Sequence, residues 1–127
     1  MVVEARVVFL LVTSRRTGRW IFPKGSISIG MTAWDSAAKE AQEEAGVTGR
    51  IAIEPIGTYQ NSDKGMLVDI DIYPLQVEAQ QDTWDEMDQR LRHWVLLAEA
   101  RRLLADRTLV DIAETLHRRL STGLFIQ

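Results

Sequence analysis

The fold is decided by the stretch Trp20–Val47, which reads WIFPKGSISIGMTAWDSAAKEAQEEAGV. Its apolar start predicts a short strand, Pro23–Gly25 predicts a turn, and the remainder predicts one amphipathic helix. Thr32 is placed to cap this helix, because its hydroxyl can accept from a free backbone N–H, and Asp35 can reach back. Gly46 suits the far end, where a left-handed residue closes the last turn at little steric cost.

The predicted helix separates small side chains from acidic ones. The small face consists of Trp34, Ala37, Ala38, Ala41 and Ala45, and it allows a sheet to approach closely. Glu40, Glu43 and Glu44 form an acidic stripe beside it, since positions three and four apart are neighbours on a helix. Like charges at this spacing destabilise a helix by roughly 0.2–0.5 kcal/mol per pair, and no basic residue lies inside the stripe. The stripe is therefore either a solvated face or a site for a divalent cation, which takes hard oxygen ligands.

The glycines and the preceding turn extend this pattern into a longer motif. Gly25, five residues, Met31, seven residues and then KEAQEEAGV at 39–47 resemble the Nudix box of the Nudix hydrolases. Two positions depart from the family pattern, because Met31 stands in place of a glutamate and Lys39 in place of an arginine. The resemblance implies an α+β fold, the Nudix α/β/α sandwich with a mixed central sheet, formed by residues 1–127 as a single domain.

The flanks are most similar to the diphosphoinositol polyphosphate and diadenosine polyphosphate hydrolase branch of this superfamily. The segments that carry this similarity are Val12–Ser14, Arg19–Pro23, Asp82–Asp85, Arg92–Val95 and Leu97–Ala100. They are less specific than the box, and substrate choice varies among close relatives of this branch.

The resemblance also implies a chemistry. Mg²⁺ or Mn²⁺ neutralises phosphate charge and makes a bound water more acidic, so catalysis is mainly positioning and electrostatics. Glu40 and Glu44 are then expected as direct metal ligands, and Glu43 as a further ligand or the base that takes the proton of the water. The Gly25 carbonyl is expected to complete the metal site, as in relatives.

Two basic residues are predicted to bind the phosphates of the substrate. Lys24 lies between a rigid proline and the box glycine, where an ammonium can meet a terminal phosphate as a point charge. The alternative for this position is a solvent-exposed lysine of the turn. Arg19 ends the polar turn at 13–19 and is the second residue predicted to bind phosphate. The other arginines of that turn, Arg15 and Arg16, are expected to be solvated.

Composition limits the remaining classes. The 127 residues suffice for one domain with a core, and 46% hydrophobic with 26% charged residues is ordinary for a globular protein. A formal charge of −3 without a basic stripe argues against nucleic-acid binding. The absence of cysteine removes disulfides, zinc–thiolate sites and cysteine nucleophiles, and fits a reducing cytoplasm. The apolar run Val7–Val12 is too short to span a bilayer, so no membrane association is expected. Homodimers are common among relatives, although no stretch here predicts an interface.

The rest of the chain predicts strands followed by helices. Val3–Val12 reads as a strand that starts alternating and becomes buried on both faces. Met66–Val77 reads as an alternating strand preceded by a turn at Asn61–Gly65. The segments after it are predicted as a loop at Gln80–Arg90, a strand at Leu91–Leu97 and helices at Ala98–Leu104 and Thr108–Leu120.

Two functions of different class follow. The first is a metal-dependent hydrolase of phosphoanhydrides, in a nucleoside diphosphate linked to another group or in a dinucleoside or inositol polyphosphate. The second is a catalytically weak or inactive Nudix-fold module that binds a nucleotide, an inositol phosphate or a protein, because Met31 and Lys39 both weaken the expected metal cluster. A third reading, an RNA-decapping member, is disfavoured by the acidic charge balance.

Overall fold

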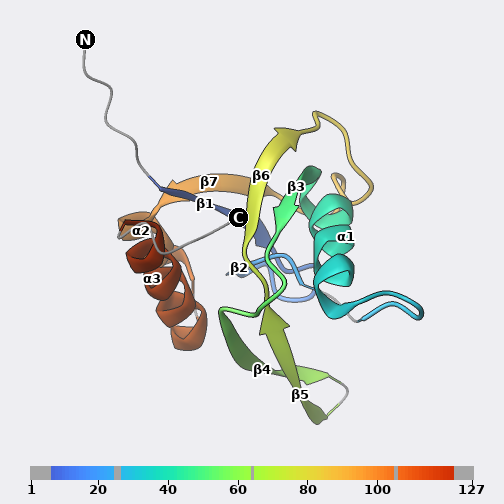
Figure 1. Cartoon of the computed structure of the whole chain (residues 1–127), viewed down its shortest axis with the longest axis horizontal. Coiled ribbons are helices and arrows are strands. Elements are labelled where there is room, and N and C mark those ends of the chain that lie inside the picture. The colour runs from blue at the N-terminus through green and yellow to red at the C-terminus, as the bar shows by residue number, and fades with distance from the viewer. Residues whose placement is uncertain (1–6, 25–26, 64, 105, 122–127) are drawn as a thin grey trace.

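Helices cover the strands on two sides. The computed structural model describes residues 7–24, 27–63, 65–104 and 106–121. Helix α1 (Ala33–Ala45) lies on one side of the strands, and α2 (Leu97–Leu103) and α3 (Arg107–Ser121) lie on the other (Figure 1). The predicted α/β/α layering is therefore confirmed. None of the described helices combines the length and apolarity needed to cross a membrane.

Strand β1 (Val8–Thr13) is the centre of the arrangement. It pairs antiparallel with β2 (Trp20–Ile21) on one edge and with β7 (Arg92–Leu96) on the other. The other pairs are also antiparallel, β3 (Val47–Ile51) with β6 (Leu75–Gln80), and β4 (Gly57–Asp63) with β5 (Met66–Ile72). A single parallel bridge joins Trp20 to Leu104. The α+β class is confirmed, and the strands form three hydrogen-bonded groups.

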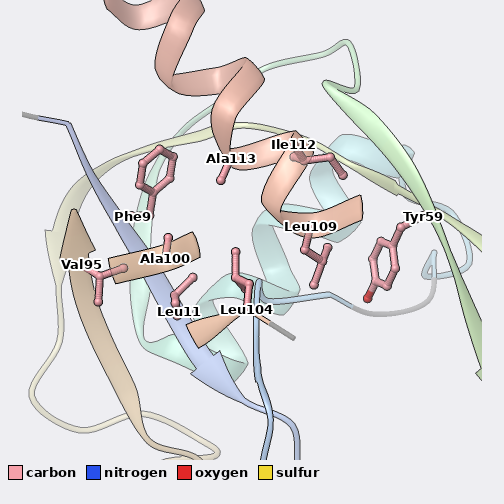
Figure 2. Close-up of a cluster of buried hydrophobic side chains, with 9 residues drawn as sticks. All are labelled: Phe9, Leu11, Tyr59, Val95, Ala100, Leu104, Leu109, Ile112 and Ala113. Atoms are coloured by element: carbon pink, nitrogen blue, oxygen red, sulfur yellow. The ribbon is translucent and has the colours of Figure 1, made fainter. Parts of the chain in front are cut away.

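Strand β1 packs on both faces beyond Val8, which is 48% exposed. Phe9 and Leu11 point to the cluster under α2 and α3, which Figure 2 shows together with Leu109 of α3. The alternate residue Val12 packs instead with Ala41 of α1 and its neighbours. Full burial of a side chain such as Leu11 contributes about 1.5–3 kcal/mol, so this strand ties the two helical layers together.

Helix α1 begins and ends where the sequence predicts. The Thr32 Oγ1 atom accepts a hydrogen bond of 3.1 Å from the backbone N–H of Asp35. Gly46 ends the helix with φ +68°, and its N–H donates to the carbonyl of Gln42. A Cβ atom at Gly46 would lie 2.8 Å from the Cβ of Trp84, so glycine is required here for space as well as for conformation.

Two predictions about the central strands are wrong. The stretch Met66–Val77 is not one strand, because Pro74 has no N–H to donate and the chain divides there into β5 and β6. The predicted turn at Asn61–Gly65 is shorter than expected, since β4 continues through Asp63. Gly65 takes the left-handed turn conformation, with φ +81°. The first four residues of the predicted strand Val3–Val12 lie outside the described residues.

Candidate functional site

The three glutamates of the stripe differ sharply in burial. Glu44 is only 1% exposed, whereas the side chain of Glu43 is 31% exposed and Glu40 is half-buried. A solvated acidic face, the alternative left open by the sequence, therefore does not describe Glu44. A carboxylate is costly to bury unless charges or hydrogen bonds compensate it, so its surroundings decide what the site can do.

Glu44 is held from two directions. The backbone N–H of Lys24 donates to its Oε2 atom at 3.1 Å. The Arg90 Nη2 atom lies 3.1 Å from its Oε1 atom, an ion pair that lacks hydrogen-bond geometry. The Oε1 atom is buried and accepts no hydrogen bond from any described residue. Its lone pairs are therefore available to a cation.

The buried position of Glu44 disfavours its ionised form. Burial raises the pKa of Glu44 to about 8, the Arg90 guanidinium opposes that rise, and the carboxylates of Glu40 and Glu86 add to it. Burial also raises the pKa of Glu40, and the nearby Glu43 carboxylate raises it further. A divalent cation would reverse both effects, because a positive charge favours the ionised carboxylates.

The residues present fit a magnesium-type ion, although they do not enclose one. Within the described ranges, no group of three or more His, Cys, Asp and Glu side chains is arranged to hold a metal ion by itself. Mg²⁺ commonly takes one or two carboxylates and completes its shell with water and substrate phosphate. The buried Oε1 atom of Glu44, which accepts no hydrogen bond from the described residues, suits that role. The predicted ligand Gly25 lies outside the described residues.

The two positions that depart from the family pattern both lie at the surface. Lys39 Nζ is 3.6 Å from Glu43 Oε1 and 3.4 Å from Ser28 Oγ, so a basic residue does offset part of the acidic stripe, contrary to expectation. Met31 is 37% exposed in the loop before α1. Neither side chain has a contact with Glu44 among the hydrogen bonds and ion pairs of the described residues.

A cavity of about 1450 Å³ adjoins this site. The predicted phosphate-binding residues Arg19 and Lys24 both line it, as does Arg90. None of the three glutamates is among its described lining residues, so the cavity reaches the acidic site through Lys24 and Arg90. Lys24 contacts Glu44 by its backbone rather than its side chain, and its ammonium role stays a prediction.

Comparison with known proteins places this geometry in a family. A family model described as the NUDIX domain matches residues 2–118. The chain belongs to the Nudix family. It is 37% identical to Nudix hydrolase 21, chloroplastic, of Arabidopsis thaliana, over 72% of this chain and 47% of the relative. It is 29% identical to diphosphoinositol polyphosphate phosphohydrolase 2 of Rattus norvegicus, over 76% of this chain and 54% of the relative. The Nudix chain spans about half the length of these curated relatives.

Solved structures show the same Nudix fold. The C. elegans Ap4A hydrolase in a binary complex matches with a TM-score of 0.69 at 19% identity, over 92% of this chain and 88% of that one. The solution structure of the E. coli ORF135 protein matches with a TM-score of 0.63 at 17% identity, over 89% and 81% of the two chains. At these identities the likeness establishes the fold and not the substrate.

Sequence reasoning missed the residues that hold the end of the Nudix helix. The Trp84 Nε1–H group donates to the Glu44 carbonyl at 2.9 Å, and Arg92 Nη1 donates to the Ala45 carbonyl at 2.8 Å. The Arg92 guanidinium also lies 3.8 Å from the Trp84 ring centroid. Because the last carbonyls of a helix lack partners within it, donors elsewhere in the chain are expected. Both donors lie in the segments Asp82–Asp85 and Arg92–Val95, whose family similarity was a signal, but that similarity did not predict their contacts with this helix.

Proposed function

We propose that this chain hydrolyses phosphoanhydride bonds with the help of Mg²⁺ or Mn²⁺ at Glu40, Glu43 and Glu44. Membership of the Nudix family supports a hydrolase. The observation that carries the proposal is the buried Glu44 Oε1 atom, which accepts no hydrogen bond from the described residues although it lies 3.1 Å from Arg90 Nη2. The pKa of Glu44 stays raised to about 8 although Arg90 lies 3.1 Å from Oε1, so a further positive charge would favour the ionised carboxylate.

Each residue has a defined task in this proposal. When bound, the cation neutralises phosphate charge and acidifies a water. Glu44 is oriented by the Lys24 N–H and by Arg90, so its carboxylate does not need to reorganise. Glu43, with a side chain that is 31% exposed, is accessible as a further ligand or as the base for the water proton. Arg19 and Lys24 line the adjoining cavity and meet the phosphates of the substrate.

The proposed substrates carry a chain of phosphates joined to a second group. They are a nucleoside diphosphate linked to another group, or a dinucleoside or inositol polyphosphate. The names of the rat phosphohydrolase and the C. elegans Ap4A hydrolase support this class.

The cytoplasmic location and the homodimer belong to this proposal as well. The location rests on the cysteine-free composition. Several relatives carry mitochondrial or chloroplastic names, which describe those proteins. The homodimer rests on the family resemblance.

A second candidate is a Nudix-fold binding module that does not hydrolyse. The observation that favours it is that the described acidic side chains do not enclose a metal ion by themselves. The surface pair of Lys39 and Glu43 agrees with it, because a lysine cannot hold a carboxylate with the planar fork of an arginine.

One panel of substrates distinguishes the two candidates. Wild type and Glu44→Gln are assayed for product release from dinucleoside polyphosphates, nucleoside di- and triphosphates, nucleotide sugars and inositol pyrophosphates, with Mg²⁺, with Mn²⁺ and with chelator. The hydrolase proposal predicts metal-dependent turnover of at least one class by wild type. Folded wild type that binds a member of the panel without turning any over would establish the binding module instead.

A further inference from the structure

Arg90 connects three separate parts of the structure through three different nitrogen atoms. Its Nε atom pairs with Glu86 Oε1 at 2.7 Å, within the loop that precedes β7. Its Nη1 atom donates to the Thr13 carbonyl at 2.9 Å, at the end of β1. Its Nη2 atom lies 3.1 Å from Glu44 Oε1, on α1. The side chain is only 10% exposed.

The backbone beside Arg90 is fixed as well. The N–H of Leu91 donates to Thr13 Oγ1 at 2.9 Å, and the N–H of Thr13 donates to the Leu91 carbonyl at 3.1 Å. The N–H of Glu86 donates to the Glu43 carbonyl at 3.1 Å, so the same loop is attached to the last turn of α1. The backbone next to Arg90 and two of its three guanidinium nitrogens, Nε and Nη1, are therefore held in place independently of Glu44.

We infer that Arg90 is a positioning residue, which holds the Glu44 carboxylate in a fixed orientation toward the cation while leaving its Oε1 lone pairs unused. The inference rests on the proposed function, because it assumes that Glu44 is a metal ligand. The ion pair without hydrogen-bond geometry is the central observation. The Arg90 guanidinium attracts the Oε1 atom by its charge. Because it does not form a hydrogen bond with Oε1, the lone pairs of that atom stay available to a cation.

Arg90 is the main charge that favours the ionised form of Glu44. The carboxylates of Glu40 and Glu86 also act on Glu44, and Arg90 forms ion pairs with both Glu86 and Glu44. Lys39 cannot replace Arg90, because its ammonium contacts Glu43 and Ser28 at the surface.

The structure also explains why a lysine should not replace Arg90. All three guanidinium nitrogens are engaged, each with a different part of the fold. A lysine has one nitrogen on a flexible stem and cannot reach three such directions at once. Arg90→Lys keeps the positive charge but loses the fixed contacts of the guanidinium, so it tests the effect of orienting Glu44 apart from the effect of the charge.

The test is a calorimetric titration of Mg²⁺ into wild type, Arg90→Lys and Arg101→Lys. Arg101 is the matched control, because its Nε atom also pairs with a glutamate, Glu114, at 2.9 Å, but on helices α2 and α3. We expect Arg90→Lys to weaken Mg²⁺ binding about 10–100-fold, the usual effect of losing a partner that orients a ligand, and Arg101→Lys to leave it unchanged. Equal affinity of wild type and a folded Arg90→Lys would overturn the inference.

A metal-free cycle covers the remaining outcomes. Thermal unfolding is measured for Arg90→Lys, Glu44→Gln and the double variant. Coupling between the two sites, or recovery of folding in the double variant when Arg90→Lys alone does not fold, supports the contact as described. Additive effects, or a double variant that stays unfolded, contradict it. Should wild type bind no Mg²⁺, the metal proposal fails, and this cycle alone decides whether Arg90 positions Glu44.

Discussion

Glu44→Gln should change how the stability of the metal-free protein depends on pH. Glu44 is 1% exposed, and its pKa is raised from 4.5 to about 8 in the fold. The folded chain therefore retains a proton that the unfolded chain has already released, so stability is lost as pH rises through this window. Each pKa unit corresponds to about 1.4 kcal/mol, so between pH 5 and pH 8 wild type should lose roughly 3 kcal/mol relative to Glu44→Gln. Glutamine, which resembles the protonated acid, does not titrate.

Urea unfolding at several pH values in the presence of chelator measures this difference. A second series with Mg²⁺ should remove much of the loss in wild type, because 100-fold excess over the dissociation constant adds about 2.7 kcal/mol. Glu43→Gln is the matched control on the same helix, and it should keep the pH slope of wild type because it retains Glu44. If wild type and Glu44→Gln lose stability in parallel from pH 5 to pH 8, the account of the buried carboxylate is wrong.

Three further outcomes follow from the geometry. His93→Ala should retain most of the turnover that Glu44→Gln loses, since the His93 side chain is 50% exposed and pairs with an acid outside the site; initial rates with Mg²⁺ measure this. Met31→Glu should shift the free energy of unfolding by no more than about 0.5 kcal/mol, because the side chain is at the surface; thermal melting tests it. Gly46→Ala should destabilise the fold by more than the roughly 1 kcal/mol expected for its backbone strain alone, because its Cβ would meet the Trp84 side chain. Gly65→Ala, with open space around it, should show only the cost of the backbone strain in the same melts.

Much of the fold could be predicted because its signals are local. The caps of α1 depend on Thr32 and Gly46, whose preferences act within one helical turn. The packing of β1 on both faces beyond Val8 follows from its unbroken apolar run. The division of Met66–Val77 into two strands was signalled by Pro74, but the alternation on either side of that proline hid it.

The candidate site could be predicted only in part, because its electrostatics depend on distant residues. Helical spacing brings Glu40, Glu43 and Glu44 together, yet it cannot show that Glu44 is buried. That difference arises from contacts between α1 and a loop 40 or more residues further along the chain, where Arg90 and Glu86 lie. The energies of such long-range pairs depend on the folded geometry and not on sequence spacing.

Metal-dependent hydrolysis at Glu44 is tested most directly by measuring product release from the panel substrate that wild type turns over fastest. Wild type is assayed with saturating Mg²⁺ and with chelator, and Glu44→Gln is assayed beside it. Chelator should abolish turnover. Glu44→Gln, confirmed as folded by its melting curve, should lower the rate by at least about 100-fold, the scale of losing a charge-stabilising group. Turnover that persists in chelator, or a folded Glu44→Gln that matches wild type, would contradict metal-dependent hydrolysis at Glu44.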